Sequence, residues 1–216
     1  SGIFHITLSN LIYIDAINLA PRLQNQIRRL AAFRNPVFYK NQAMNLSNFS
    51  NSRYIYLGED VDGYIAIPRG ILEVLIAKLE ESAIRYEIID ERQEGRNIDV
   101  DFQGTLRENQ MNAVSKMIQF DTGILSAATA FGKTVVCCDL IAEKGKNTLI
   151  LLESSSLINQ WNDSIGKFLS IKEELPTYKT KTGIIKTRKS NVGILHGAKD
   201  TTTGIIDIAM VGTLYS

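Results

Sequence analysis

Three consecutive residues, Gly132, Lys133 and Thr134, have the types and the order that bind a nucleoside triphosphate. They end the stretch Ala127–Thr134 (AATAFGKT), which follows the pattern G-x-x-x-x-G-K-[ST] except that alanine replaces the first glycine. In such a loop the lysine ammonium reaches the β- and γ-phosphates, the threonine hydroxyl binds Mg²⁺, and the glycine lets the backbone approach phosphate. The stretch therefore predicts a phosphate loop in which Lys133 and Thr134 are the catalytic residues.

A phosphate loop needs a strand before it and a helix after it, because N–H groups at a helix N-terminus point at the bound anion. The sequence predicts the strand over 123–127 and the helix over 133–144. A chance Gly-Lys-Thr at the start of a helix is the alternative, and the two flanking elements argue against it. Ala130 raises a separate question, since alanine is strained if this position requires a positive φ.

The rest of the second half alternates between helices and strands. A helix is predicted over 106–120, where Thr105 and Glu108 have the spacing of a capping box. The apolar run 147–152 (NTLILL) is typical of a buried parallel strand. The alternation predicts a parallel sheet with helices on its faces. The other expected elements are a helix over 156–168, an excursion or hairpin over 172–190, and strands over 191–197 and 206–214.

The first half has a different pattern, with strands and helices that do not alternate regularly. The polar piece 92–97 (RQEGRN) is the best candidate for a boundary. We predict a small N-terminal α+β domain over 1–95 and a second domain over 96–216. The elements expected before the boundary are a strand or hairpin over 3–15, a helix over 19–33, a break at Asn35-Pro36, a hairpin around Asp62-Gly63, a helix over 71–83 and a strand over 86–91.

The charges are distributed unevenly along a chain whose formal net charge is only +1. No acid occurs from Ala16 to Gly58 or from Pro176 to Lys199, whereas Glu59–Asp101 holds twelve acids against five bases. Basic patches of this size suit a nucleic-acid phosphate backbone. A solvated face is the alternative for each block taken alone. The bases of the two blocks are Arg22, Arg28, Arg29, Arg34, Lys40, Arg53, Lys179, Lys181, Lys186, Arg188, Lys189 and Lys199.

The composition narrows the class of protein. The chain has 216 residues, of which 44% are hydrophobic and 22% charged, as in ordinary globular proteins. No run approaches the roughly 18 apolar residues of a membrane span, and the N-terminus has no signal-peptide pattern. Cys137 and Cys138 are the only cysteines, which favours a reduced, cytoplasmic protein without a zinc site. Trp161 has the spacing of a core residue rather than of a base-stacking platform.

Segments on both sides of the loop resemble superfamily 2 helicases and translocases. LRENQ (106–110) resembles their glutamine motif, and NTLILLESSSLINQW (147–161) resembles their LVLVxxxxLxxQW segment. AATAFGKT resembles their APTGxGKT loop, with Ala128 in place of proline and Ala130 in place of glycine. The resemblance covers about residues 103–216. It implies an α/β fold in which an incomplete RecA-like parallel-sheet P-loop domain follows the small α+β domain.

The same resemblance implies ATP and Mg²⁺ as cofactors and assigns roles to individual residues. Gln110 would read the adenine edge, supported by Arg107, and Thr134 would hold Mg²⁺ through ATP. The other residues implied to bind the nucleotide are Ala128, Thr129, Ala130, Phe131, Gly132 and Lys133, and those implied to contact nucleic acid are Ser154, Ser155, Ser156 and Thr213.

The first half resembles the small N-terminal domain found in the DNA-repair branch of these helicases. The segments that carry this resemblance are NPVFYKNQ (35–42) and YIAIPRGILEVL (64–75). The branch includes the repair and transcription helicase of TFIIH and bacterial restriction-like helicases. By this resemblance, the N-terminal domain would engage duplex DNA.

One departure from the family affects the expected activity. The chain contains no D-E-x-H or D-E-x-D, whose acids hold Mg²⁺ and polarise the attacking water in these enzymes. We therefore expect a fragment of a DNA-stimulated ATPase motor that hydrolyses ATP hardly at all by itself. Its expected partners are DNA, duplex or single strand, and the missing second RecA-like domain of the same protein. The alternatives are the motor subunit of a restriction system and a nucleic-acid-binding module without catalysis.

Overall fold

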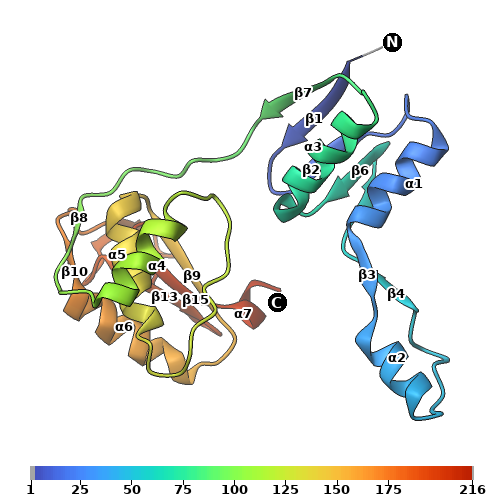
Figure 1. Ribbon diagram of the computed structural model, residues 1–216. Helices are drawn as coiled ribbons and strands as arrows, with labels where there is room; N and C mark the ends of the chain where they lie inside the picture. The colour runs from blue at the N-terminus through green and yellow to red at the C-terminus, as the bar shows by residue number, and fades with distance from the viewer. Residues whose placement is uncertain (1–2, 216) are drawn as a thin grey trace. The chain divides into compact units, whose positions relative to one another are not determined.

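The chain folds into two compact units in a computed structural model that describes residues 3–215 (Figure 1). The first unit ends at Gln93 and the second begins at Glu94. Each unit has its own hydrophobic core, so each is described by itself.

The first unit is built on a five-stranded sheet with the order β5-β6-β2-β1-β7. Only the β1–β7 pair is parallel, so the predicted α+β class is confirmed. Asp62 and Gly63 have φ values of 50° and 85°, the backbone of a two-residue hairpin turn, as predicted. The strands are β1 (Phe4–Leu8), β2 (Ile12–Asp15), β5 (Glu59–Val61), β6 (Tyr64–Ile67) and β7 (Tyr86–Asp90).

Two helices bury their apolar sides against this sheet. They are α1 (Pro21–Leu30) and α3 (Leu72–Glu81), and a short 3-10 turn, η1 (Arg69–Ile71), precedes α3. Pro21 is at the start of α1, where its missing N–H costs nothing because no acceptor is available there. The core unites Ile27 of α1, Leu75 and Leu79 of α3, and strand residues such as Ile6, Ile14 and Ile65, all completely buried.

An arm, defined here as residues 32–56, extends from this sheet in Figure 1. It consists of β3 (Ala32–Arg34), α2 (Pro36–Ala43) and β4 (Tyr54–Tyr56), with β3 paired to β4 in a separate sheet. The sequence predicted only a break at Asn35-Pro36, and α2 was missed. The Asn35 side chain accepts a hydrogen bond from the Val37 N–H (3.0 Å) and caps α2. Because α2 buries none of its residues, it has no apolar stripe to reveal it.

The second unit is a RecA-like α/β domain with a mostly parallel sheet, as predicted. Its sheet has the order β14-β13-β15-β9, in which only β14 is antiparallel to its neighbour. Its strands are β9 (Thr148–Leu152), β13 (Val192–His196), β14 (Lys199–Asp200) and β15 (Ile206–Met210).

One face of this sheet is covered by α5 (Lys133–Lys144) and α6 (Ser156–Phe168). The bounds of both helices match the predictions. Buried apolar residues of the two helices and of β9 and β15 form one core, and Trp161 packs against it from a half-buried position, as predicted. The principal contributors are Cys138, Ile141, Ile150, Ile158, Ile165, Ile206 and Ile208.

The other face of β9 is open. Leu149 and Leu151 are 55% and 52% exposed, whereas Ile150 and Leu152 are buried. The predicted burial of the whole apolar run is therefore wrong for alternate residues. The cause is the position of β9 at the edge of the sheet, where only one face is covered by helices.

The second unit also contains two short antiparallel pairs of strands and two further helices. The expected hairpin within 172–190 is confirmed as β11 (Thr177–Lys179) paired with β12 (Ile185–Thr187). A second antiparallel pair joins β8 (Val100–Phe102) to β10 (Leu169–Ile171). Two further helices are α4 (Glu108–Met117) and α7 (Val211–Leu214).

Candidate functional site

Three groups of predicted site residues lie at one edge of the parallel sheet. Only residues 145–147 separate α5 from β9, so α5 runs back along the sheet and its Lys133 end lies where β9 ends. Ser154–Ser156 follow the end of β9, and Thr213 follows the end of β15, whose Met210 is paired with Leu152. Open α/β sheets bind ligands at the carboxyl ends of their strands, which is this edge.

The GKT loop, residues 127–134, presents unpaired donors at the start of α5. Gly132 caps the helix in a left-handed conformation, with φ 89° and ψ 41°. Within residues 3–215, the N–H groups of Gly132, Lys133 and Thr134 donate to no acceptor. Free N–H groups and the positive end of a helix dipole favour an anion at the same place. The loop is therefore suited to phosphate.

The strand predicted over 123–127 is wrong. This segment is irregular in the structure, and Ile124 is 95% exposed. A strand requires a hydrogen-bonded neighbour. Among the strands of residues 3–215, none is paired with this segment. The apolar residues of 123–127 favour a strand. A strand forms, however, only where a neighbouring strand is available to pair with it.

Arg107 and Gln110 hold the GKT loop from the side of α4. The Gln110 side chain is only 4% exposed; its Oε1 accepts from the Arg107 N–H (2.9 Å) and its Nε2 donates to the Phe131 carbonyl (2.8 Å). The Arg107 guanidinium donates to the same Phe131 carbonyl and to that of Ala130 (3.5 Å). Both ends of the glutamine amide are thus engaged by the protein. In this conformation these two residues position the loop.

The same contact corrects the predicted capping box at Thr105 and Glu108. The helix α4 begins at Glu108, and Arg107 is its N-cap. Gln110, the third residue of the helix, accepts from the N-cap N–H and so fills the reciprocal half of the box. The box falls two residues later because Gln110 satisfies the N-cap N–H and also reaches the GKT loop.

Lys133 is folded back on its own loop. Its Nζ donates to the carbonyl oxygens of Ala127 (2.7 Å) and Ala128 (3.1 Å), and the side chain is exposed. These carbonyls compensate the ammonium charge only partly, because they carry no full negative charge. A phosphate at the loop would replace them with charged oxygens, which form shorter and stronger hydrogen bonds with an ammonium.

Ala130 has φ 64°, the left-handed conformation that the sequence raised as a possibility. An L-residue other than glycine loses roughly 1–2 kcal/mol there. Glycine would remove that strain but would lose about 0.4–1 kcal/mol through the greater freedom of the unfolded chain. We expect Ala130→Gly to raise the unfolding temperature by about 1–2 °C.

Ala128→Gly is the matched control, because Ala128 is also exposed in the loop and has no positive φ. Thermal unfolding should show a decrease for this variant. A decrease for both variants would contradict the strain assigned to Ala130.

The described part of the chain offers few ligands for a metal. No group of three or more histidines, cysteines and acids able to hold a metal ion occurs among the described residues. The half-buried Thr134 hydroxyl is available at the start of α5. Asp207 lies at the amino end of β15 and accepts from the N–H groups of Thr203 and Gly204 (2.8 Å each), so it is directed away from the loop edge. Among the described residues, the Thr134 hydroxyl is therefore the candidate ligand for a Mg²⁺ at the loop.

The residues predicted to contact nucleic acid follow the carboxyl ends of two neighbouring strands, β9 and β15. Ser154–Ser156 are all exposed, and the hydroxyls of Ser154 and Ser156 lie 2.7 Å apart in a hydrogen bond. Thr213 is half-buried, and its Oγ1 accepts from the Gly197 N–H (3.1 Å), which ties α7 to the turn after β13.

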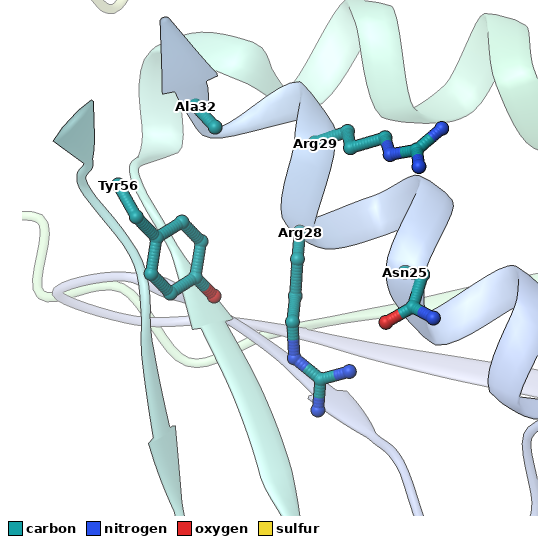
Figure 2. Close-up of a pocket in the computed structure, with 5 residues that line it drawn as sticks. All are labelled: Asn25, Arg28, Arg29, Ala32 and Tyr56. Atoms are coloured by element: carbon teal, nitrogen blue, oxygen red, sulfur yellow. The ribbon is translucent and has the colours of Figure 1, made fainter. Parts of the chain in front are cut away.

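The first unit contains a second candidate site that the sequence did not predict as a pocket. Asn25, Arg28 and Arg29 of α1 line a cavity of about 300 Å³ with Ala32 and Tyr56, as Figure 2 shows. The Arg28 guanidinium pairs with Asp60 (3.1 Å). Burial, and then the Asp60 charge, raise the pKa of Tyr56. The spacing of the α1 residues, three and four apart on one helix face, was the available signal.

The two thiols show no sign of reactivity. Cys138 is buried and Cys137 half-buried, and both are free. Burial raises the pKa of the Cys138 thiol to about 12.

Across the described residues, no helix combines the length and the apolar character that crossing a bilayer requires.

Comparisons with known proteins give this fold and loop a class. The solved structure of the UvsW helicase from bacteriophage T4 matches 99% of this chain and 76% of its own, with a TM-score of 0.57 and 13% identity, which supports the fold alone. The family match and the relatives with helicase names together identify the class as that of the superfamily 2 helicases. The chain belongs to the ResIII family, described as the type III restriction enzyme res subunit, whose model matches residues 103–216, more than half of the chain.

Curated relatives with helicase names match shorter segments. A protein named as helicase 161L of Invertebrate iridescent virus 6 is 37% identical over 75 residues, 33% of this chain and 17% of that protein. One named as helicase 109L of Invertebrate iridescent virus 3 is 35% identical over 83 residues, 37% of this chain and 25% of that protein. One named as DNA 3'-5' helicase Rad25 of Haloarcula marismortui is 30% identical over 91 residues, 41% of this chain and 15% of that protein. The matches thus span a quarter or less of these relatives.

Proposed function

We propose that the chain is the N-terminal unit and most of the first motor domain of an ATP-dependent superfamily 2 DNA helicase or translocase of the repair or restriction type. The observation that carries this proposal is the GKT loop. It lies at the carboxyl edge of a parallel sheet, with three unpaired N–H groups at the start of α5. An anion with several oxygens is the ligand that this arrangement suits best.

The geometry of the loop supports a set of proposed roles in nucleotide binding. The N–H groups of Gly132, Lys133 and Thr134 would surround the phosphates, and the Lys133 ammonium would leave the Ala127 and Ala128 carbonyls to bind the terminal phosphates. The Thr134 hydroxyl would hold Mg²⁺, which supplies charge neutralisation when bound. The other nucleotide contacts are proposed for Arg107, Gln110, Thr129, Ala130 and Phe131.

Adenine recognition by Gln110 requires a rearrangement of its contacts. Its Nε2 and Oε1 are occupied by Phe131 and Arg107, and only 4% of the residue is exposed. A nucleotide that displaced the Phe131 carbonyl would free the amide for the base. We propose that binding of the base to Gln110 thereby changes the conformation of the loop at Phe131.

Nucleic acid is proposed to bind at the same sheet edge and on the first unit. Ser154–Ser156 and Thr213 would contact the strand backbone through their hydroxyls. The arm of the first unit carries Arg34 and Arg53 and no acid, and its Phe33 and Tyr54 are 45% and 54% exposed. Exposed aromatic rings among bases suit DNA.

Hydrolysis depends on groups that this sequence does not contain. Phosphoryl transfer needs acids that hold Mg²⁺ and position water, and the chain has no D-E-x-H or D-E-x-D. We propose that these acids and a second RecA-like domain belong to a longer protein. The chain by itself would then bind ATP weakly and hydrolyse it hardly at all.

The test is ATP hydrolysis by that longer protein, measured with and without DNA. The proposal predicts faster hydrolysis with DNA present. Equal rates in the two conditions would contradict the motor function, and shifts of a labelled duplex without any hydrolysis would favour a nucleic-acid-binding module.

A restriction motor is the second candidate, and the res-subunit family model favours it. Such a protein would translocate on DNA for a nuclease domain or partner. Cleavage of DNA that depends on ATP would distinguish it from a repair helicase. The two free thiols fit a cytoplasmic location in either case.

A further inference from the structure

The hairpin β11–β12 carries positive charge that no acid compensates. Residues 176–199 contain no aspartate or glutamate. Five lysines here are exposed, and none of them pairs with a carboxylate within residues 3–215. Solvated protein surfaces normally mix both signs of charge. The five are Lys179, Lys181, Lys186, Lys189 and Lys199.

Packing does not explain this composition. All three residues of β12 are exposed, and β12 pairs only with β11. Two-stranded hairpins without a core are marginal in water. This one is held at its tip, where the Thr180 N–H donates to the Ile184 carbonyl (2.9 Å) and Gly183 has φ 85°. The hairpin is therefore an ordered projection whose lysines point into solvent.

Arg188 fixes the hairpin to the edge of the sheet. Its guanidinium lies 4.1 Å from the centre of the Tyr178 ring, and its Nη1 donates to the Asp200 carbonyl of β14 (3.4 Å). Tyr178 is the cross-strand partner of Lys186, so this lysine lies on the same face as the anchor. These contacts engage the Arg188 Nη1 and the face of its guanidinium, whereas the five lysines have no carboxylate partner among the described residues.

The hairpin is continuous with the proposed nucleic-acid contact at Thr213. Lys199 of β14 pairs with His196 of β13, and the next residue of that turn, Gly197, donates to the Thr213 hydroxyl (3.1 Å). The only acid along this path is Asp200, whose Oδ1 accepts from the Thr202 N–H (2.9 Å) and hydroxyl (2.8 Å).

We propose that the hairpin and its connection to β14 are a second binding site for the phosphate backbone of nucleic acid. The basic strip is defined as Lys179, Lys181, Lys186, Lys189 and Lys199, and it uses both faces of the hairpin, because Lys179 and Lys186 lie on opposite faces. The inference rests on the proposed function and extends its contact surface beyond Ser154–Ser156 and Thr213. Lysine acts as a point charge on a flexible stem, so the strip binds phosphates without reading sequence. It holds the strand while the sheet edge contacts it.

The test is DNA binding by the whole 216-residue chain with Lys179, Lys181 and Lys186 all replaced by glutamine. Affinity for a labelled duplex is measured as a function of salt without nucleotide. Loss of three phosphate contacts makes the logarithmic salt slope shallower by about 2.7, because each contact contributes about 0.9. Between about 50 and 200 mM salt, the affinity of this variant then falls roughly 40-fold less than that of the unaltered chain.

Two further variants distinguish an effect of charge at the basic strip from an effect of the total charge of the unit. Replacing Lys116, Lys146 and Lys172 by glutamine removes the same charge from the same unit, but Lys146 and Lys172 already pair with Glu94 and Asp101. This control keeps the slope of the unaltered chain. Arginine at the three hairpin positions also keeps it.

An unchanged slope in the hairpin variant overturns the basic strip, as does an equal change in the control. Neither outcome affects the proposed motor function, which is tested by DNA-stimulated hydrolysis. If the unaltered chain binds no DNA at about 50 mM salt, both the strip and the proposed DNA contacts of this chain are wrong.

Discussion

Substitution of Lys133 by alanine is expected to lower ATP hydrolysis by the longer protein at least about 100-fold, the effect of removing one preorganised charge donor from a transition state. The ammonium is the only full positive charge on the GKT loop, and its present partners are two neutral carbonyls. Since Lys133 is exposed and contributes nothing to the core, the variant should unfold at the same temperature as the unaltered protein.

Lys116→Ala is the matched control for this prediction. Lys116 is an exposed lysine on α4 in the same unit, outside the GKT loop. Steady-state hydrolysis with saturating DNA should be normal in this control and nearly absent in Lys133→Ala. Comparable rates for Lys133→Ala and the unaltered enzyme would show that the GKT loop has no part in ATP hydrolysis.

The second large effect is expected for Gly132→Ala. A Cβ at this position would lie 2.5 Å from Gln110 Nε2, and the φ of 89° is unfavourable for any side chain. The backbone strain amounts to roughly 1–2 kcal/mol, and the clash with the buried Gln110 amide adds about 1–3 kcal/mol. Both are relieved when the loop leaves the conformation in which its N–H groups face the phosphates. Because about 1.4 kcal/mol is tenfold in affinity, we expect ATP binding by the chain to weaken about 100-fold.

Gly123→Ala separates this effect from a general cost of replacing glycine. Gly123 lies in the same connection, has no positive φ, and would place a Cβ in open space. Titration with a fluorescent ATP analogue should therefore give an unchanged dissociation constant for Gly123→Ala. Equal affinities for Gly132→Ala and Gly123→Ala would show that the close approach of Gln110 to the loop has no role in binding.

The elements of the second unit that depend on local pattern could be predicted from the sequence. Lys133–Lys144 and Ser156–Phe168 form the expected helices, because each has an apolar side that reaches the core. The segment 123–127 could not be predicted, since a strand depends on a neighbour that its own residues do not specify. The sequence showed that Ala130 would be strained if its φ were positive, but it could not show the sign of φ. That sign is set by the geometry of the loop.

The contacts among distant residues lay beyond the sequence. The resemblance assigned Gln110 to the adenine edge, with Arg107 in support, and it gave no sign of a contact with the loop. In the structure both side chains donate to the Phe131 carbonyl, more than twenty residues away along the chain. The helix α2 buries no residue and so lacked a periodic signal. The cavity lined by Arg29 and Tyr56 required the pairing of β3 with β4, which no local pattern reveals.

The central claim is that the N–H groups at the start of α5 bind the phosphates of ATP. The most direct measurement is a titration of the isotope-labelled chain with Mg-ATP, followed by amide chemical shifts in NMR spectra. The account predicts that the amide signals of Gly132, Lys133 and Thr134 shift together and saturate, and that they no longer do so in Lys133→Ala. Shifts confined to the α1 cavity, at Arg28 and Arg29, with the loop signals unmoved, would contradict it.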